Sequence, residues 1–391
     1  MNNDFSVLFL ASWYPTPEYP THGIFIRNHA KALSNYCNVI VMYVYSSNEI
    51  SEVILEHHSH QNLNEYIIAF PKSKIPVLKS FIHFIKYQYY YFRLCQLVKK
   101  HFKNIRYAQI NVIYPVALFF YVIKLLLKIK SYTIFEQWTG YLKEDNSFKG
   151  FWRKMITKRL IKNARKVWCL CEYQKNAMLQ HQLYGNYEIL GNVINTNIFL
   201  PKERTISSTK RFIHVSTLDN KQKNISSILK AFSEIEKEGH HFELIIVGGK
   251  DEYLLNAKKL AQELNLKNVE FTGILPQETL PYYYQTSDAL VMFSNYETFC
   301  VAVYEALSCG IYVITTPVAD LDKIISEKFG TLVDIGNEQQ LKNAILKVIH
   351  QQYKPYPDEA HQLVKNNFSE EVIGKKFYDY YCSLENQSNK L

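Results

Sequence analysis

Apolar segments of strand length alternate with segments of helical periodicity along both halves of this 391-residue chain. Such alternation is typical of parallel sheets whose two faces are covered by helices. Because 391 residues exceed what one hydrophobic core usually organises, the pattern predicts two α/β domains, each built on a parallel sheet. Strands are expected in the first half near 7–11, 38–45, 66–70, 109–113, 132–136, 166–170 and 187–190, and in the second near 212–217, 242–247, 269–271, 289–294, 312–316 and 331–333. The first-half helices are expected near 24–34, 77–102, 116–130, 149–164 and 172–182.

The domain boundary is predicted between Asn192 and Thr209, where turn-forming Asn residues, Pro201 and a polar run interrupt the alternation. We therefore expect a first domain over 1–195, a linker over 196–209 and a second domain over 210–368. Residues 369–391 form a last, aromatic-rich helical segment.

Composition narrows the class of protein. Hydrophobic residues make up 47% of the chain and charged residues 21%, which is typical of a globular protein. Seven scattered Cys without a C-x-x-C pair favour reduced thiols in the cytoplasm over a disulfide framework or a zinc site. The run Val7–Ala11 is too short for a secretory signal, and the apolar segment Val112–Ile129 contains Pro115, Lys124 and Lys128, so no spanning helix is expected.

The charge is unevenly distributed. Residues 1–200 contain 24 Lys and Arg against 11 Asp and Glu, whereas residues 201–391 contain 21 against 25. The densest basic segment, 148–166, has eight cations and no acid, with apolar residues interleaved at helical spacing. We expect the apolar stripe to pack on the sheet and the cations to face an anionic membrane surface, with helix 77–102 as a candidate addition to that surface. The alternative is that these cations are only solvated.

A strand-to-helix turn carries the most informative residues. The apolar run Ala289–Ser294 predicts a buried strand, and Glu297 and Glu305 follow it eight positions apart. In an open α/β sheet this turn lies at the carboxyl edge of the strands, where ligands bind. Carboxylates accept hydrogen bonds from sugar hydroxyls, and the backbone N–H groups of Thr298, Phe299 and Cys300 at the expected helix start favour a phosphate. The turn therefore suits a nucleotide-sugar.

The spacing of the two acids resembles the E-x7-E signature of the retaining glycosyltransferases of family 4, although two solvated acids beside a buried turn would have the same spacing. The resemblance implies the GT-B fold, with two Rossmann-like domains whose parallel sheets face each other across a cleft, and a last helix that crosses back to the first domain. It also implies transfer of a sugar from a nucleotide-diphosphate-sugar with retention of configuration and without a metal or other cofactor. A polysaccharide or lipid-linked glycan intermediate is the acceptor it implies, and the enzyme is expected in the cytoplasm, peripheral on the inner face of the cell membrane.

The resemblance assigns roles to residues of the second domain. Glu305 would hold the ribose hydroxyls and Glu297 the hydroxyls of the donor sugar, while Lys223 would stabilise the departing phosphate. The position at which the family has an Arg is Thr217, for which Lys221 is a candidate substitute.

Two further strand ends are expected at the donor. The strand ending in Gly249 lets a ligand approach the backbone, and Gly273 and Ile274 match the edge that meets the nucleobase. Ordinary loops would look the same at each of these positions taken alone.

The first domain matches the family more loosely. Gly23 lies where the family has a glycine-bearing loop between the donor phosphate and the acceptor, so the resemblance implies a donor contact there, and His22 replaces a second glycine as a candidate positioning residue. Gln137 stands where a His commonly precedes Trp, and because glutamine cannot hold a proton at neutral pH we expect it to position a ligand or to be a satisfied buried residue.

Two motifs are expected to have no catalytic role. Asp320-Leu-Asp322 has the spacing of a metal clasp, but no further acid or His completes a hard-cation site, so we predict helix capping and no metal. Cys300 lies near the site without a His to activate it, which favours a filler over a nucleophile.

Three other functions remain alternatives. A sugar-nucleotide epimerase of similar fold would need an acid/base pair poised near neutral pH. A non-catalytic nucleotide- or membrane-binding protein would fit the departures at Thr217 and Gln137. Nucleic-acid binding would require salt-sensitive affinity for oligonucleotides, and we do not expect it.

Overall fold

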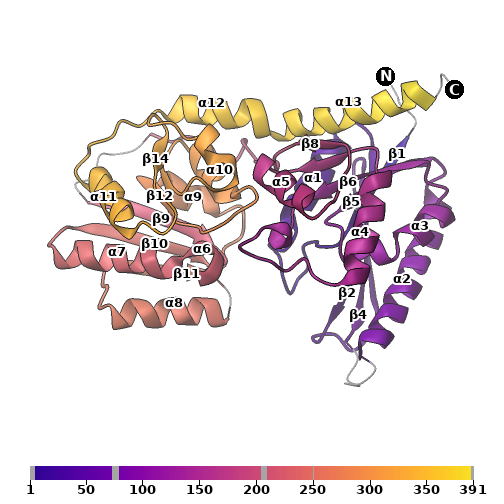
Figure 1. Ribbon diagram of the computed structural model, residues 1–391, viewed down its shortest axis with the longest axis horizontal. Coiled ribbons are helices and arrows are strands. Elements are labelled where there is room, and N and C mark those ends of the chain that lie inside the picture. Colours follow the sequence, from indigo (N-terminus) through magenta and orange to yellow (C-terminus); the bar gives the residue numbers. More distant parts are fainter. Residues whose placement is uncertain (1–4, 73–78, 204–208, 250, 389–391) are drawn as a thin grey trace. The chain divides into compact units, whose positions relative to one another are not determined.

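The computed structural model describes residues 5–72, 79–203, 209–249 and 251–388 and divides into two compact units (Figure 1). The first unit comprises residues 1–170, 174–193 and 370–391, and the second comprises 171–173 and 194–369. Residues 204–208 of the predicted linker lie outside the described residues, as does the start of the predicted helix 77–102.

The first unit is built on an eight-stranded sheet with the order β3-β4-β2-β1-β5-β6-β7-β8. All neighbouring strands are parallel except β3, which pairs antiparallel with β4. The strands are β1 (Ser6–Ala11), β2 (Asn38–Ser47), β3 (Ile54–His60), β4 (Leu63–Pro71), β5 (Ile105–Asn111), β6 (Ser131–Glu136), β7 (Val167–Cys169) and β8 (Tyr187–Ile189). Strand β3 is absent from the sequence prediction because its side chains are largely exposed and polar, so it has no apolar signature.

Helices cover this sheet. They are α1 (Ile24–Ser34), α2 (Lys79–His101), η1 (Val116–Leu118), α3 (Phe120–Leu126), η2 (Thr139–Tyr141), α4 (Phe151–Asn163), α5 (Glu172–Gln180) and α13 (Glu370–Ser388). The predicted helix 116–130 is divided at Phe119 into η1 and α3.

The expectation that the whole apolar stripe of 148–166 packs on the sheet is wrong. Leu160 and Ile161 of α4 are buried, but Phe151, Trp152 and Met155 are exposed. The stripe therefore has a buried half and an exposed half, because only the last two turns of α4 lie against the core.

The C-terminal helix α13 packs on the first unit. Phe377 is fully buried, with its ring 5.0 Å from that of Trp168, and the Tyr381 hydroxyl lies 2.9 Å from Thr133 Oγ1 and donates to Gln109 Oε1 at 3.1 Å. Gly374 permits close contact with α1, since a Cβ atom there would lie 2.2 Å from the Ala32 carbonyl oxygen. The end of the chain thus completes the hydrophobic core of the unit that its beginning forms.

The second unit is built on a six-stranded parallel sheet with the order β11-β10-β9-β12-β13-β14. Its strands are β9 (Lys210–Ser216), β10 (Phe242–Gly248), β11 (Val269–Gly273), β12 (Ala289–Met292), β13 (Tyr312–Thr315) and β14 (Gly330–Leu332). Its helical elements are α6 (Asn220–Lys223), α7 (Ile225–Lys237), α8 (Glu252–Glu263), α9 (Leu280–Gln285), α10 (Val301–Ser308), η3 (Val318–Lys323), α11 (Glu338–Ile349) and α12 (Pro357–Phe368). The core lies between sheet and helices, with the rings of Phe212, Phe232 and Phe242 at its centre.

Strand order in this sheet reverses at β9. The chain proceeds outward from β9 to β10 and β11, then returns to place β12 on the other side of β9. The loops that follow β9 and β12 therefore leave the same edge of the sheet side by side, which is where open α/β sheets bind ligands.

Replacing Phe377 with Ala should destabilise the first unit by about 3–5 kcal/mol, because the change leaves a cavity among buried aromatic rings. Chemical denaturation followed by circular dichroism measures the effect. The exposed Phe81 of α2 provides a matched control, since Phe81→Ala should change stability by no more than about 0.5 kcal/mol. Equal effects of the two substitutions would contradict the packing of α13.

Candidate functional site

Two loops of the second unit are held together at the edge where strand order reverses. The backbone N–H of Asn295, in the loop after β12, donates to the Gln222 carbonyl at 2.8 Å. The Asn295 side-chain amide donates to the Lys221 carbonyl at 2.9 Å. The α6 turn and the loop before α10 therefore form one structural element, and both predicted cationic residues lie on it.

Glu297 is the centre of this element. Its side chain is buried, at 5% exposure, and forms an ion pair with Lys223. Gln222 Nε2 donates to its second oxygen at 3.1 Å, and Ser294 Oγ donates at 3.0 Å to the oxygen that Lys223 contacts. Burial by itself would lower the pKa of Lys223, but the Glu297 carboxylate outweighs it and the pKa lies above its ordinary value, so Lys223 carries its charge.

The sequence reasoning missed Gln222 and Ser294. Gln222 directly precedes Lys223, and Ser294 follows the buried strand β12. These positions in the sequence were the one indication that the two residues lie near the site. Nothing in the residue types alone indicates that both contact one carboxylate.

Glu305 is one of the buried residues of α10. It is 7% exposed, and the hydroxyl of fully buried Tyr284 on α9 donates to its Oε2 at 3.0 Å. Burial raises the pKa of Glu305 to about 7, although the hydrogen bond from Tyr284 favours the carboxylate. Tyr284 was also not predicted from the sequence. Residues 282–284 are all Tyr, so the sequence does not indicate which of the three rings is buried.

The start of α10 lies slightly later than the sequence predicts. The helix begins at Val301, and Cys300 precedes it in the left-handed conformation with φ of 60°. Thr298, Phe299 and Cys300 therefore belong to the buried loop that leads into the helix. The Phe299 ring stacks on Tyr304 at 4.3 Å, which fixes the loop.

The Cys300 thiol is protonated at neutral pH. Burial, reinforced by the nearby Glu297 carboxylate, raises its pKa to about 12. A protonated, buried thiol is a poor nucleophile, in keeping with a packing role.

The glycines at the end of β10 are required by the protein's own packing. Gly249 has φ of 71°, and a Cβ atom there would lie 2.4 Å from Leu218 Cδ1. The Leu218 side chain thus occupies the Cβ position of Gly249, and the close approach of a ligand to this backbone stays a prediction. Gly273 at the end of β11 is less crowded, with Leu254 at 3.9 Å, and Ile274 beside it is exposed.

A buried histidine fixes the loop after β9. His214 is fully buried, and its Nδ1 lies 2.8 Å from the Val291 carbonyl, which can only accept, so Nδ1 donates. Burial lowers the pKa of His214 to about 4, so its Nε2 is unprotonated and accepts from Ser216 Oγ at 2.7 Å. Ser216 Oγ in turn accepts the Leu218 N–H at 3.0 Å.

This chain of hydrogen bonds sets the path toward α6. Thr217, which stands where the family has an Arg, is exposed in the same loop. The backbone N–H of Lys221 donates to Asp219 Oδ1 at 3.0 Å, and Lys221 is also exposed.

Three candidate residues belong to the first unit. Gly23 precedes α1 with φ of 70°, and a Cβ atom there would lie 2.5 Å from the Trp13 carbonyl carbon, so glycine is required. The His22 ring lies 5.6 Å from that of Trp13. Gln137 is buried directly after β6, and its backbone N–H donates to Glu136 at 2.9 Å.

Glu136 organises the edge of the first sheet and was not predicted. This fully buried carboxylate accepts hydrogen bonds from the backbone N–H groups of Ile113, Gln137 and Trp138 and from the Tyr141 hydroxyl, all between 2.9 and 3.1 Å. Burial raises its pKa although the four donors oppose the shift. The loops after β5 and β6 are therefore held by a single side chain.

The D-x-D motif contributes a helix contact. Asp320 accepts the N–H of Glu172, the first residue of α5, at 2.7 Å, and pairs with Lys323 at 3.2 Å. Within the described ranges, no three His, Cys, Asp or Glu side chains gather as a metal site would require.

Comparison with known proteins relates the second unit to a protein family. Residues 197–369 match the family model for glycosyl transferases group 1. The probable sucrose-phosphate synthase of Thermosipho melanesiensis is 31% identical over 195 residues, which are 47% of this chain and 44% of that protein. The alpha-monoglucosyldiacylglycerol synthase of Streptococcus pneumoniae is 31% identical over 184 residues, 46% of this chain and 38% of that protein. The chain thus spans less than half the length of either relative.

The solved structure of Anabaena HepE in complex with UDP has the same fold. It superposes with a TM-score of 0.71 at 14% identity, over 97% of this chain and 100% of that one. These findings confirm the family resemblance and the GT-B fold class expected from the sequence, with a parallel-sheet domain in each unit.

Stability should depend on pH through Glu305. Its pKa is about 7 in the folded protein against an ordinary value of 4.5, so the folded state binds more protons between these values and stability falls as pH rises through them. Wild type should therefore lose on the order of 2–3 kcal/mol relative to Glu305→Gln between pH 5 and pH 8. Urea denaturation at several pH values measures the difference. The exposed Glu263→Gln should show no such divergence from wild type, and a pH-independent difference for Glu305→Gln would contradict a buried, neutralisable carboxyl.

Proposed function

We propose that this chain, which carries a group 1 glycosyltransferase domain over residues 197–369, transfers a sugar from a nucleotide-diphosphate-sugar to an acceptor with retention of configuration. The observation that carries the proposal is the ion pair of Lys223, whose side chain is 13% exposed, with buried Glu297, in one unit with buried Glu305 at the edge where strand order reverses. The complex of HepE with UDP supports a nucleoside diphosphate as the leaving group.

Glu305 would bind the ribose. A carboxyl whose pKa is about 7 is partly protonated near neutral pH, and two ribose hydroxyls that donate to it would favour the ionised form. The Tyr284 hydroxyl donates to Oε2 of Glu305 and so fixes the orientation of the carboxyl group. Donor binding should consequently displace a proton from Glu305.

Lys223 and Glu297 would act on the diphosphate and the sugar. Each satisfies the other's charge, as ions with little exposure to solvent must. Cleavage of the sugar–phosphate bond adds negative charge to the leaving diphosphate, which the Lys223 ammonium and the backbone N–H groups near Phe299 would stabilise without a metal. Gln222 and Ser294 would keep Glu297 directed at the hydroxyls of the sugar.

The first unit would present the acceptor. Its Gly23 loop, His22 and buried Gln137 lie at the ends of strands β1 and β6, and Glu136 holds the latter loop in place. We take the acceptor to be a glycan or a lipid-linked glycan at the inner face of the cell membrane. The basic segment 148–166 supports this, as does the relative named for synthesis of a glucosylated diacylglycerol. Among the helices described, none is long and apolar enough to span a bilayer.

Donor binding is tested with a panel of nucleotide-sugars and thermal denaturation, in which a bound donor should raise the melting temperature. Glu305→Ala should weaken binding of the best donor at least about tenfold, since a good hydrogen bond to a charged group contributes about 1.5–3 kcal/mol. Calorimetry at pH 6.5 in buffers of different ionisation enthalpy should show proton release by wild type that is absent in Glu305→Gln. Glu263→Ala is the matched control, and unchanged affinity of Glu305→Ala would remove Glu305 from the donor site.

Transfer is tested with Glu297→Gln and Lys223→Met, using release of nucleoside diphosphate with a glycan acceptor. Each substitution should lower kcat about 10²–10³-fold, as does removal of a group that stabilises developing charge. NMR of the product should show the anomeric configuration of the donor. An epimerised nucleotide-sugar as the product, or donor binding with no transfer to any acceptor, would instead support an epimerase or a non-catalytic binding protein.

A further inference from the structure

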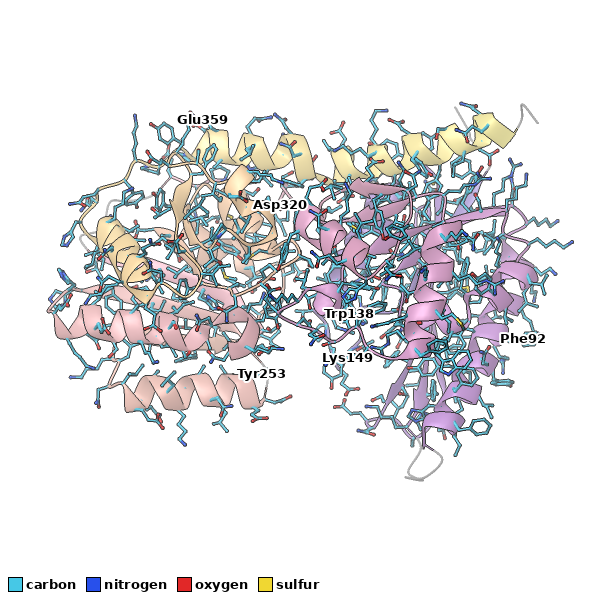
Figure 2. The ribbon with its side chains drawn as sticks, viewed as in Figure 1. Phe92, Trp138, Lys149, Tyr253, Asp320 and Glu359 are labelled. Carbon is cyan, nitrogen blue, oxygen red and sulfur yellow. The ribbon has the colours of Figure 1, made fainter. Side chains whose placement is uncertain are left out.

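Exposed apolar side chains gather on three helices of the first unit. They project from α2, from the segment η1–α3 and from the first turns of α4. The members of this set, which we call the aromatic face, are Phe81, Phe84, Ile85, Tyr89, Phe92, Leu118, Tyr121, Val122, Leu125, Phe151, Trp152 and Met155. Figure 2 shows Phe92 at the outer side of its helix.

The exposure is large for residues of this kind. Leu125 is 79% exposed, Phe151 74% and Trp152 69%. Helix α2 already buries one stripe, which includes Tyr91, Leu94 and Val98, so its exposed stripe is a second apolar face. Soluble proteins rarely expose apolar patches of this extent unless the patch binds something.

The three helices that carry the aromatic face are neighbours. The Phe119 ring between η1 and α3 lies 5.8 Å from that of Phe84 and 5.2 Å from that of Tyr91 on α2. The Arg159 guanidinium of α4 lies over the Tyr121 ring of α3 at 5.4 Å. Figure 1 shows α2, α3 and α4 side by side in this unit.

The three helices that carry the aromatic face have charges of one sign. The sequences of α2, α3 and α4 contain no Asp or Glu. Their described cations are Lys86, Arg93, Lys99, Lys100, Lys124, Arg153, Lys154, Lys158, Arg159 and Lys162. Long cationic side chains that surround an apolar patch can reach phosphate groups while the apolar residues enter a hydrocarbon layer.

We propose that the aromatic face inserts into the surface of an anionic phospholipid bilayer, with α2, α3 and α4 lying at the level of the headgroups. This proposal rests on the proposed function, in which the basic segment 148–166 supports a location at the membrane. It adds insertion of apolar side chains to that contact. The cations favour the anionic leaflet, and the exposed aromatic and aliphatic side chains add shallow burial in the acyl region. A second copy of the chain would bring cations of the same sign together in a two-fold contact, which disfavours that occupant.

The first experiment is co-sedimentation with vesicles of phosphatidylcholine alone or with phosphatidylglycerol at one part in three. Wild type should bind the anionic vesicles at least tenfold more tightly. The triple variant Leu125→Ser, Phe151→Ser, Trp152→Ser should lose at least tenfold of that affinity at unchanged net charge. Tyr253→Ser with Leu255→Ser removes exposed apolar residues of α8 in the second unit and should bind as wild type does.

The second experiment reports insertion directly. Lipids brominated on their acyl chains should quench part of the tryptophan fluorescence of vesicle-bound protein. The substitution Trp152→Phe should abolish most of this quenching, because the buried Trp168 does not reach the lipid. Full binding of the triple variant, or quenching that Trp152→Phe does not change, would overturn insertion. Preferential binding of oligonucleotides over vesicles would assign the face to a nucleic acid. A dimer that forms without lipid in wild type and not in the triple variant would assign it to a second copy of the chain.

These outcomes are separable from the proposed function. Donor-induced thermal stabilisation without vesicles should be the same in wild type and the triple variant, because Leu125, Phe151 and Trp152 are exposed and none of them is a candidate donor residue. Loss of vesicle binding with intact donor binding therefore concerns the membrane face alone. Intact vesicle binding with no donor response would leave the membrane face standing and overturn the transferase.

Discussion

The ion pair of Lys223 and Glu297, which has little exposure to solvent, joins the two loops on which the site of the second unit depends. Neither charge could be buried alone without a large desolvation cost, so each requires the other until a ligand replaces it. The parallel sheet makes the pairing possible, because strand order reverses at β9 and brings the ends of β9 and β12 together. The proposed donor site is thus held in shape by the same two charges that we propose contact the donor.

Buried polar side chains fix the loops in both units. His214 connects β9 to its following loop through Ser216, and Glu136 collects four donors at the ends of β5 and β6. In each unit a fully buried group is satisfied mainly by backbone or near-backbone partners, which leaves little freedom to the adjoining loop. Loops that carry function on a rigid sheet are expected to be restrained in this manner.

The two units differ in what they offer to partners. The second unit has its unusual residues largely shielded from solvent, as the buried carboxyls of Glu297 and Glu305 and the mostly covered ammonium of Lys223, where charge interactions are strongest. The first unit gathers its unusual residues outside, as cations and exposed aromatic rings on α2, α3 and α4. The proposed nucleotide-sugar would bind in the second unit, and the proposed membrane contact would involve the first unit.

Periodicity, spacing and charge are local properties of a chain, and they were enough to predict the two parallel α/β domains, the strand-to-helix turn with Glu297 and Glu305, and the excess of cations in the first half. The sequence could not show β3, whose exposed polar residues have no buried pattern, nor the partners Gln222, Ser294 and Tyr284, which come from other elements. It also misjudged α4, since a helical stripe indicates an apolar face but not what covers it. Burial, and with it the raised pKa of Glu305 and the pairing of Lys223, arises only when distant segments pack together, and so the tertiary structure alone decided them.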